Sequence, residues 1–517
     1  MAPERSFTIS FISDVHGCFS NLDYASGKER ASGLCNCAGL FARDGNALVI
    51  DGGDALQGSP FTVYYHQGGS RKQYLPAQIM NAAGVQFMTL GNHDFNYGIP
   101  VIEQYLSQLH AVCLCANLDG IRGVRKTAVA TLENGLRIGL TGVTSHYVEK
   151  WEPPENLKGV IVRDAFTSAS SALEELRAQG ADVTVCIYHG GFERDVTTGA
   201  VLSESDENQG WRLCEELGFD ILLTGHQHMR VDSACLFGTH TCQCPAKAAG
   251  FIRMDVSVPE DRAGKPLQVA SRFVPAGERR SEKLWAYLSK EEDKASRWLD
   301  CPVGRLDRPL TPGEHLETAV NGSLLANFFN QVQLAASGAE VSVTCLDNTP
   351  KGLPKEVSIR DVASSYPFPN TLRVLEVDRH VLREALERCA EYFTLDENGE
   401  LQISKAFLTP IEQHYSYDFY SGIETVFDVS RPFGQRVVSI RFQGEELPEG
   451  RKLKLCINSY RATGAGGYPA FAKCPVLWEG TKEISELIMD YISSHREIKV
   501  DSTKWLTVIT GKKRDNL

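Results

Sequence analysis

The chain has 517 residues, a formal net charge of −12 and 42% hydrophobic residues. This length is more than one hydrophobic core supports, so we expect two or three domains, and the apolar content argues against disorder. A nucleic-acid polymer is not an expected partner, because such binding needs a basic face and this chain is acidic. Binding of smaller phosphate compounds is compatible with the charge, since metal ions and a few Arg side chains can supply local positive charge.

No apolar run approaches the roughly 18 residues that a membrane span needs. The first residues show no basic region followed by an apolar run and a cleavage site. We therefore expect a cytoplasmic protein without membrane contact, or an extracytoplasmic one if a signal peptide has been removed. A monomer or a weak oligomer is expected.

Taken in chain order, apolar runs alternate with helical patterns from residue 7 to about 275, which indicates an α/β domain. A helix is predicted over 165–179, where Gly180 ends the pattern, and a charged, solvent-facing helix over 279–299. An amphipathic helix follows over 322–336, and the domain boundary is expected near it. Further strands are predicted at 340–345, 372–377 and 437–442, with a helix over 380–393.

Five apolar runs of the first half end in side chains that commonly bind metals. If the runs are neighbouring strands, their carboxyl ends place these side chains along one sheet edge, where α/β proteins keep their chemistry. Carboxylate, amide and imidazole groups without thiolates suit a pair of divalent ions such as Mn, Zn, Co or Fe. The groups are Asp14 with His16, Asp54, Asn92 with His93, His189, and His226 with His228.

The spacing of these residues predicts how two ions could be held. Asp14 and His16 are two residues apart and can grip one ion from a turn at a strand end. Asp54 follows two glycines that permit a sharp turn, and it is the candidate for a carboxylate that bridges both ions. Two bridged ions about 3.5–4 Å apart can hold a hydroxide and clamp a phosphoryl group. The sequence therefore predicts phosphoester hydrolysis.

The 15 Cys residues point to a second kind of site only weakly. Several lie in apolar strand-like runs and are expected to be small core residues in a reducing compartment. One cluster leaves a structural zinc site as an alternative, although its Cys-x-Cys spacing differs from that of a zinc knuckle. This cluster consists of Cys235, His240, Cys242 and Cys244.

The strand-end motifs, in this order, resemble those of the calcineurin-like metallophosphoesterases. The second half resembles the 5'-nucleotidase C-terminal domain through residues 366–372, 414–419, 428–434 and 458–467. The resemblance implies the family of 5'-nucleotidases and 2',3'-cyclic-nucleotide phosphodiesterases. It implies an α/β fold, with a four-layer α/β/β/α sandwich as the catalytic domain and a second α+β domain that binds substrate. The corresponding boundaries are 1–318 for the catalytic domain, 319–336 for a linking helix and 337–517 for the substrate-binding domain.

The resemblance also implies roles for single residues. One ion would be held by Asp14, His16, Asp54 and His228, and the other by Asp54, Asn92, His189 and His226. His93 would stabilise charge on the phosphoryl oxygens and help to protonate the leaving alkoxide, a task that suits an imidazole. Tyr417 and Tyr460 would stack on the base of the substrate, an interaction that tolerates any base.

Two departures from the family pattern bear on the substrate. Asn96 stands three residues after His93, where strict 5'-nucleotidases have an Asp, whereas the cyclic phosphodiesterase branch also reads Asn-Tyr-Gly. An Asn cannot stabilise an imidazolium as a carboxylate would. The Arg-bearing, Gly-rich loop is replaced by residues 346–352, in which Asn348 is the candidate substrate contact, and Gly466 replaces an Asp.

These departures favour a 2',3'-cyclic-nucleotide 2'-phosphodiesterase/3'-nucleotidase. The alternative is a 5'-nucleotidase, or a hydrolase of nucleotide sugars. A nucleotide-binding protein without catalysis is a further alternative, which the complete ligand set opposes. A thiol-based metal or redox protein is another, which the placement of Cys in strands opposes.

Overall fold

The computed structural model describes residues 5–24, 27–67, 73–202, 206–260, 265–368, 370–409, 411–480 and 482–511. The chain divides into two compact units, Met1–Ser296 and Arg297–Leu517. Helix α8 (Glu282–Leu299) spans the division, and α10 (Leu324–Ser337) belongs to the second unit. No helix of the described residues is long and apolar enough to cross a membrane.

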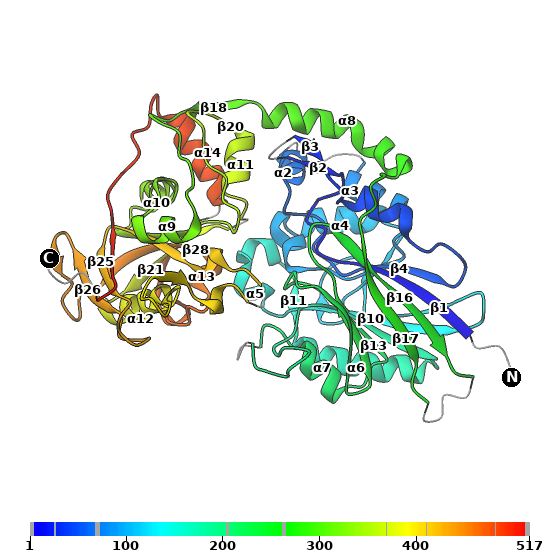
Figure 1. The fold of residues 1–517 in the computed structure, drawn as a ribbon. Coiled ribbons are helices and arrows are strands. Elements are labelled where there is room, and N and C mark those ends of the chain that lie inside the picture. The colour runs from blue at the N-terminus through cyan, green and yellow to red at the C-terminus, as the bar shows by residue number, and fades with distance from the viewer. Residues whose placement is uncertain are drawn as a thin grey trace. The chain divides into compact units, whose positions relative to one another are not determined.

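The first unit contains two sheets that share one core (Figure 1). Ile9 and Ile50 of the first sheet and Val185 and Leu223 of the second belong to this core. In order, the seven-stranded sheet has β17 (Gln268–Pro275), β16 (Gly250–Val258), β1 (Arg5–Ile12), β4 (Ala47–Asp51), β5 (Phe87–Met88), β6 (Val112–Leu114) and β8 (Val124–Arg125). The six-stranded sheet has β14 (Val231–Leu236), β15 (Thr239–Gln243), β13 (Ile221–Thr224), β12 (Val183–His189), β10 (Arg137–Thr144) and β9 (Thr127–Thr131).

Helices complete the layers of the first unit. Helix α6 (Ala165–Ala178) and α7 (Gly210–Glu216) pack on the six-stranded sheet, where Leu173 and Leu213 join a separate core with Tyr188. Figure 1 shows α3 and α4 on the side of the seven-stranded sheet away from α6 and α7. The order helix, sheet, sheet, helix confirms the predicted fold class. The other helices are α1 (Leu34–Cys37), α2 (Pro60–Gln67), α3 (Leu75–Ala83), α4 (Ile99–Gln108) and α5 (Val148–Trp151).

The pairing of the central strands sets the position of the site. β1 pairs in parallel with β4, and β4 with β5, so their carboxyl ends lie at one edge of the sheet. In the second sheet β10, β12 and β13 are likewise parallel. The predicted ligands lie at or just beyond the carboxyl ends of β1, β4, β5, β12 and β13.

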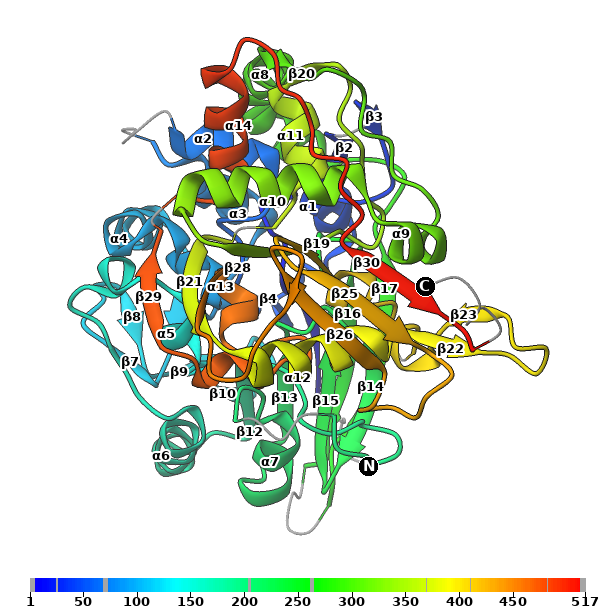
Figure 2. The same cartoon turned by 90° about the vertical axis from the view of Figure 1, so that its left-hand side faces the viewer.

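The second unit has an α+β fold around a five-stranded sheet. Val374 and Leu375 are neighbours on β21 but belong to different cores, so both faces of this sheet are buried. Figure 2 shows α10 and α12 on opposite sides of the sheet. Its strands in order are β24 (Asp418–Ser421), β19 (Val341–Cys345), β28 (Leu453–Asn458), β21 (Leu372–Val377) and β29 (Val476–Glu479).

Smaller sheets and helices complete the second unit. A four-stranded sheet has the order β27 (Glu445–Glu446), β26 (Val437–Phe442), β25 (Glu424–Asp428) and β30 (Leu506–Ile509). Two-stranded sheets pair β18 (Pro302–Arg305) with β20 (Glu356–Ser358), and β22 (Phe393–Leu395) with β23 (Leu401–Ile403). The helices besides α10 are α9 (His315–Asn321), α11 (Ile359–Ser365), α12 (Arg379–Ala390), α13 (Ser459–Ala462) and α14 (Ile484–Ser494).

Candidate metal centre

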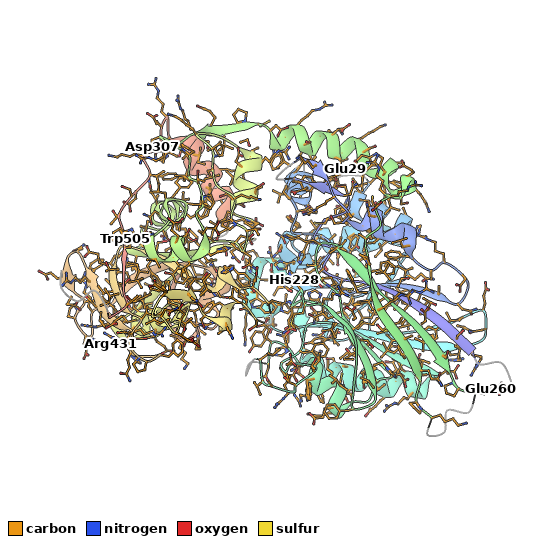
Figure 3. All side chains as sticks on the ribbon, in the orientation of Figure 1. Glu29, His228, Glu260, Asp307, Arg431 and Trp505 are labelled. Atoms are coloured by element: carbon orange, nitrogen blue, oxygen red, sulfur yellow. The ribbon has the colours of Figure 1, made fainter. Side chains whose placement is uncertain are left out.

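The predicted ligands come together at the strand ends of the first unit. Asp14 follows β1, Asp54 follows β4, and His189 is the last residue of β12. Asn92 begins the short helix η2 (Asn92–Tyr97) beyond β5, and His228, labelled in Figure 3, lies in the loop after β13. Asp14 and His228, which are 214 positions apart in the sequence, therefore meet at one place.

The backbone conformation marks the same positions. Among the described residues, nine non-glycine residues have a positive φ, and five of the nine are predicted ligands. Such conformations cost of order 1–3 kcal/mol each and cluster at functional sites. The positive φ values let the loops after the strands bring these side chains close to one another. The five residues are Asp14, His16, Asp54, His226 and His228.

One group of ligand atoms consists of Asp14, His16 and His228, whose atoms lie within 4.8 Å of one another. His16 Nε2 lies 2.9 Å from His228 Nε2, and His228 Nε2 lies 3.5 Å from Asp14 Oδ1. Burial lowers the pKa of His16 to about 3, and repulsion by His228 adds to this effect. The His16 imidazole is therefore neutral, the form in which it binds metals.

A second group consists of Asp14, Asp54 and His189. His189 Nε2 lies 3.2 Å from Asp54 Oδ2 and 3.2 Å from Asn92 Oδ1, and Asn92 Oδ1 is also 3.0 Å from His226 Nδ1. Asp54 Oδ2 lies 3.9 Å from His16 Nε2 as well, so this oxygen faces both groups. Burial alone would raise the pKa of Asp14, but the bond to His228 and nearby imidazoles lower it to about 2.

Outer contacts orient the imidazoles. His16 Nδ1 is 3.0 Å from the Gln57 carbonyl oxygen, and His189 Nδ1 is 2.7 Å from that of Gly52. A carbonyl only accepts hydrogen bonds, so both Nδ1 atoms carry hydrogen and both Nε2 atoms face the site. His226 has the opposite orientation, with Nε2 held by Glu207 Oε1 at 3.0 Å. Glu207 was not predicted, because it belongs to no strand-end motif.

His93 adjoins the ligands without joining either group. Its backbone N–H donates to Asp54 Oδ1 at 2.7 Å, so Asp54 Oδ2 is the oxygen that faces the ligand groups. The rings of His93 and His16 meet edge to face with centroids 5.3 Å apart. His93 Nδ1 lies 2.9 Å from Asn96 Oδ1, so these two side chains are paired. Asn96 in turn donates to Glu152 Oε1 at 2.6 Å, a contact that the sequence did not suggest.

Asp94 holds the backbone of two loops at the site and is not one of the predicted ligands. Its buried carboxylate accepts backbone N–H groups of Asp54, Ala55, Leu56 and Gly91 at 2.9–3.0 Å. Burial raises the pKa of Asp94 to about 6, and the charge of Asp54 acts in the same direction. The loops after β4 and β5 are therefore tied to each other by one side chain. Its place within the Gly-Asn-His-Asp motif could have drawn attention to it.

The predicted substrate-binding residues lie in the second unit. Tyr417 is only 3% exposed, and its hydroxyl donates to the Ala319 carbonyl at 3.0 Å. Tyr460, on α13, is 41% exposed. Asn348 Nδ2 donates to the Glu412 carbonyl at 2.7 Å, which anchors the loop it belongs to. The substrate contacts of these three residues stay predictions.

Gly466 replaces the expected Asp for a visible steric reason. A Cβ atom at Gly466 would lie 1.8 Å from Nη1 of Arg461, and φ there is +73°. Arg461 is buried and pairs with Asp418 through Nη2 and Oδ1 at 3.0 Å. The guanidinium therefore fills the space that a side chain at position 466 would need.

The Cys cluster does not form a third ligand group within the described ranges. Cys242 and Cys244 are buried, whereas Cys235 is exposed on the neighbouring strand opposite His240. Among the described residues, the groups of His, Cys, Asp or Glu side chains that could hold a metal ion are the two that contain Asp14. The alternative of a structural zinc site therefore gains no support from the described residues.

The fold and the ligand groups define a metal-dependent phosphoester hydrolase. The family model for the calcineurin-like phosphoesterases matches residues 7–230, and that for the 5'-nucleotidase C-terminal domain matches residues 302–473. A Staphylococcus aureus structure described as a 5'-nucleotidase is 30% identical, with a TM-score of 0.85 over 98% of this chain and 100% of that chain. The chain belongs to the 5'-nucleotidase family, as its motifs predicted.

Two relatives carry more detailed names. A 2',3'-cyclic-nucleotide 2'-phosphodiesterase/3'-nucleotidase of Haemophilus influenzae is 23% identical over 94% of this chain and 84% of its own length. The trifunctional nucleotide phosphoesterase YfkN of Bacillus subtilis is 22% identical over 99% of this chain. The match spans 39% of the length of YfkN, so this chain corresponds to a part of that protein.

Proposed function

We propose that this protein is a two-metal phosphoesterase that opens 2',3'-cyclic nucleotides and dephosphorylates 3'-mononucleotides. The convergence of two ligand groups that share Asp14 supports the two-metal chemistry. Two features support the substrate preference: Asn96 stands in place of an Asp, and loop 346–352 contains no Arg. The Haemophilus influenzae relative, whose name states this activity, gives further support.

The side chains present fit a pair of borderline divalent ions, because they offer carboxylate, amide and imidazole groups. When bound, such ions supply an activated hydroxide and neutralise charge on a phosphoryl group. Mn, Zn, Co and Fe are the candidates. One ion would be held by Asp14, His16, Asp54 and His228, and the other by Asp54, Asn92, His189 and His226.

The chain's own residues would perform the remaining work. Asp54 Oδ2 faces both ligand groups, since its other oxygen is held by the backbone N–H of His93. The imidazole of His93 would stabilise the phosphoryl oxygens and give a proton to the leaving alkoxide. Tyr460 would stack on the base, which orients the ester without selecting one base.

A 5'-nucleotidase is the second candidate, because the Staphylococcus aureus structure at 30% identity is described as one. Protein stripped with a chelator and reloaded with Mn²⁺ or Co²⁺ separates the candidates on 2',3'-cyclic AMP, 3'-AMP, AMP and a nucleotide sugar. We expect kcat/KM on the first two to exceed that on AMP at least about tenfold, a difference of about 1.4 kcal/mol. A higher value on AMP or the sugar would reverse the preference. If none of these substrates is hydrolysed, the proposal that the protein is a phosphoesterase is contradicted.

A further inference from the structure

We propose that Glu152 is a positioning residue for His93 and acts through Asn96. This inference rests on the proposed function, because it concerns the group that protonates the leaving alkoxide. Glu152 follows α5 and is 5% exposed. Its carboxylate is 56 residues away from Asn96 in sequence, yet the two side chains are hydrogen-bonded at 2.6 Å.

The contacts determine which way the Asn96 amide points. An Asn side chain has a donor end and an acceptor end of nearly the same shape, so its partners decide the orientation. An ionised carboxylate only accepts hydrogen bonds, so the NH₂ end of Asn96 faces Glu152 and the oxygen faces His93. The hydrogen of a neutral His93 therefore lies on Nδ1, and Nε2 is left for the reaction.

Asn156 reinforces this arrangement. Its Nδ2 donates to Glu152 Oε2 at 2.9 Å and to the backbone oxygen of Asn96 at 3.2 Å. Both oxygens of Glu152 thus receive a side-chain N–H, as an ionised carboxylate requires. A reversed Asn96 amide would place its oxygen against the carboxylate and its NH₂ group against the Nδ1–H of His93. The geometry strongly disfavours that state.

The chain of contacts brings a negative charge to His93 indirectly. Hydrogen bonds in series polarise one another in a protein interior, so Glu152 strengthens the acceptor that Asn96 offers to His93. Asn96 and Glu152 together would thus do what a single Asp at position 96 could do. With Asn96 in place of the Asp of 5'-nucleotidases, the His93 imidazole would be oriented by two residues instead of one.

The role of the leaving group provides the test. In 3'-AMP the leaving group is an alkoxide that needs a proton, whereas 4-nitrophenyl phosphate releases a stable phenolate that does not. We expect Glu152→Ala to lower kcat on 3'-AMP about 10- to 100-fold, with KM within about twofold of wild type, because general acid catalysis is impaired. The kcat on 4-nitrophenyl phosphate should change less than about threefold. Equal losses on both substrates, or no loss on 3'-AMP, would overturn the proposal.

A charge exchange supplies the matched control. Asn96→Asp alone places two carboxylates against each other and should be impaired. Asn96→Asp combined with Glu152→Gln keeps the shapes and the number of hydrogen-bonding groups while moving the charge next to His93. This double variant should return kcat on 3'-AMP to within about fivefold of wild type, a non-additivity expected of coupled residues. Failure of the double variant, with metal content unchanged, would contradict the proposal.

A measurement without substrate separates this inference from the proposed function. In Zn-loaded protein labelled with ¹⁵N-histidine, His93 should show the Nδ1–H tautomer, with the resonance assigned by its loss in His93→Gln. In Glu152→Ala we expect the population of the Nδ1–H tautomer of His93 to fall. Its retention would refute the positioning role even in a protein that hydrolyses no nucleotide. If wild type hydrolyses no nucleotide but Glu152→Ala still loses the tautomer preference of His93, the proposed function alone is refuted.

Discussion

At the scale of single residues, the two oxygens of Asp54 have different tasks. Oδ1 is held by the backbone N–H of His93, and Oδ2 lies near His16 and His189. Removing this side chain therefore removes an oxygen that lies near an imidazole of each ligand group, along with the anchor of the His93 backbone. No other predicted ligand combines these contacts in the described residues.

We expect Asp54→Ala to reduce the metal content from two ions to one or none. The kcat should fall at least about 100-fold, which is more than the loss of an outer partner usually causes. Metal analysis by mass spectrometry and steady-state kinetics measure the two effects. Asp293→Ala, which removes an exposed carboxylate on α8, is the control and should change neither quantity. Full metal content with normal turnover in Asp54→Ala would contradict the assignment.

We expect Glu207 to act on the metal centre through His226. Its carboxylate holds the imidazole Nε2 at 3.0 Å, so that Nδ1 faces Asn92. Glu207→Gln should weaken binding of one ion about 10- to 100-fold, as loss of an outer carboxylate usually does. Competition with a chelator of known affinity measures this change. Two unchanged affinities would show that the ring does not need this partner.

At the scale of elements, the predicted helices and the strands predicted at 340–345, 372–377 and 437–442 were observed close to their predicted bounds, whereas one apolar run formed a shorter strand than expected. The helices predicted over 165–179 and 322–336 are observed as α6 (Ala165–Ala178) and α10 (Leu324–Ser337). The apolar run 85–90 forms a strand only over Phe87–Met88, since the backbone beyond it turns and Gly91 N–H donates to Asp94. An apolar run shows that a segment is buried, but hydrogen-bond partners elsewhere decide how far the strand extends.

Helix α8 contains a buried carboxyl group that should make stability depend on pH. Glu292 is 3% exposed and accepts hydrogen bonds from the Tyr24 hydroxyl. Burial raises its pKa from 4.5 to about 7. A raised carboxyl pKa means that the folded state binds the proton more tightly, so the stabilisation is present below pH 4.5 and is lost as the pH rises through 7.

Glu292→Gln removes this dependence. Relative to wild type, its free energy of unfolding should increase between pH 4.5 and pH 8 by about 3 kcal/mol, the value of a shift of this size. Calorimetry across this pH range measures the difference, in which the effects of metal binding common to both proteins cancel. Asp293→Asn, an exposed neighbour, should run parallel to wild type. A constant difference between Glu292→Gln and wild type would contradict the pKa assignment.

At the scale of the whole molecule, the two units carry different kinds of residues. The ligand groups and His93 lie in the first unit, and the exposed ring of Tyr460 lies in the second. Chemistry and base recognition should therefore be separable by mutation. Substrates with and without a base are the means of separating them.

Tyr460→Ala should raise KM for 3'-AMP about 5- to 100-fold, the equivalent of about 1–3 kcal/mol of stacking. The kcat should change little, and the KM for 4-nitrophenyl phosphate, which has no base, should stay the same. Tyr460→Phe keeps the ring and serves as the control. An equal rise in KM for both substrates would show that the variant perturbs the second unit instead of losing a stacking contact.

The amino-acid sequence by itself determined the class of fold and the predicted ligands. Apolar runs that end in Asp, Asn or His carry both kinds of information locally, and the ligand types restrict the chemistry. The tertiary structure alone revealed Glu152 and Glu207, which lie 56 and 19 residues from the side chains they bond. They lie in loops without periodicity, and their partners are set by how the strands and helices pack. It also showed that Tyr417 is buried, because local sequence does not reveal how far an aromatic ring is covered by the rest of the fold. The contact of Tyr417 with a base stays a prediction.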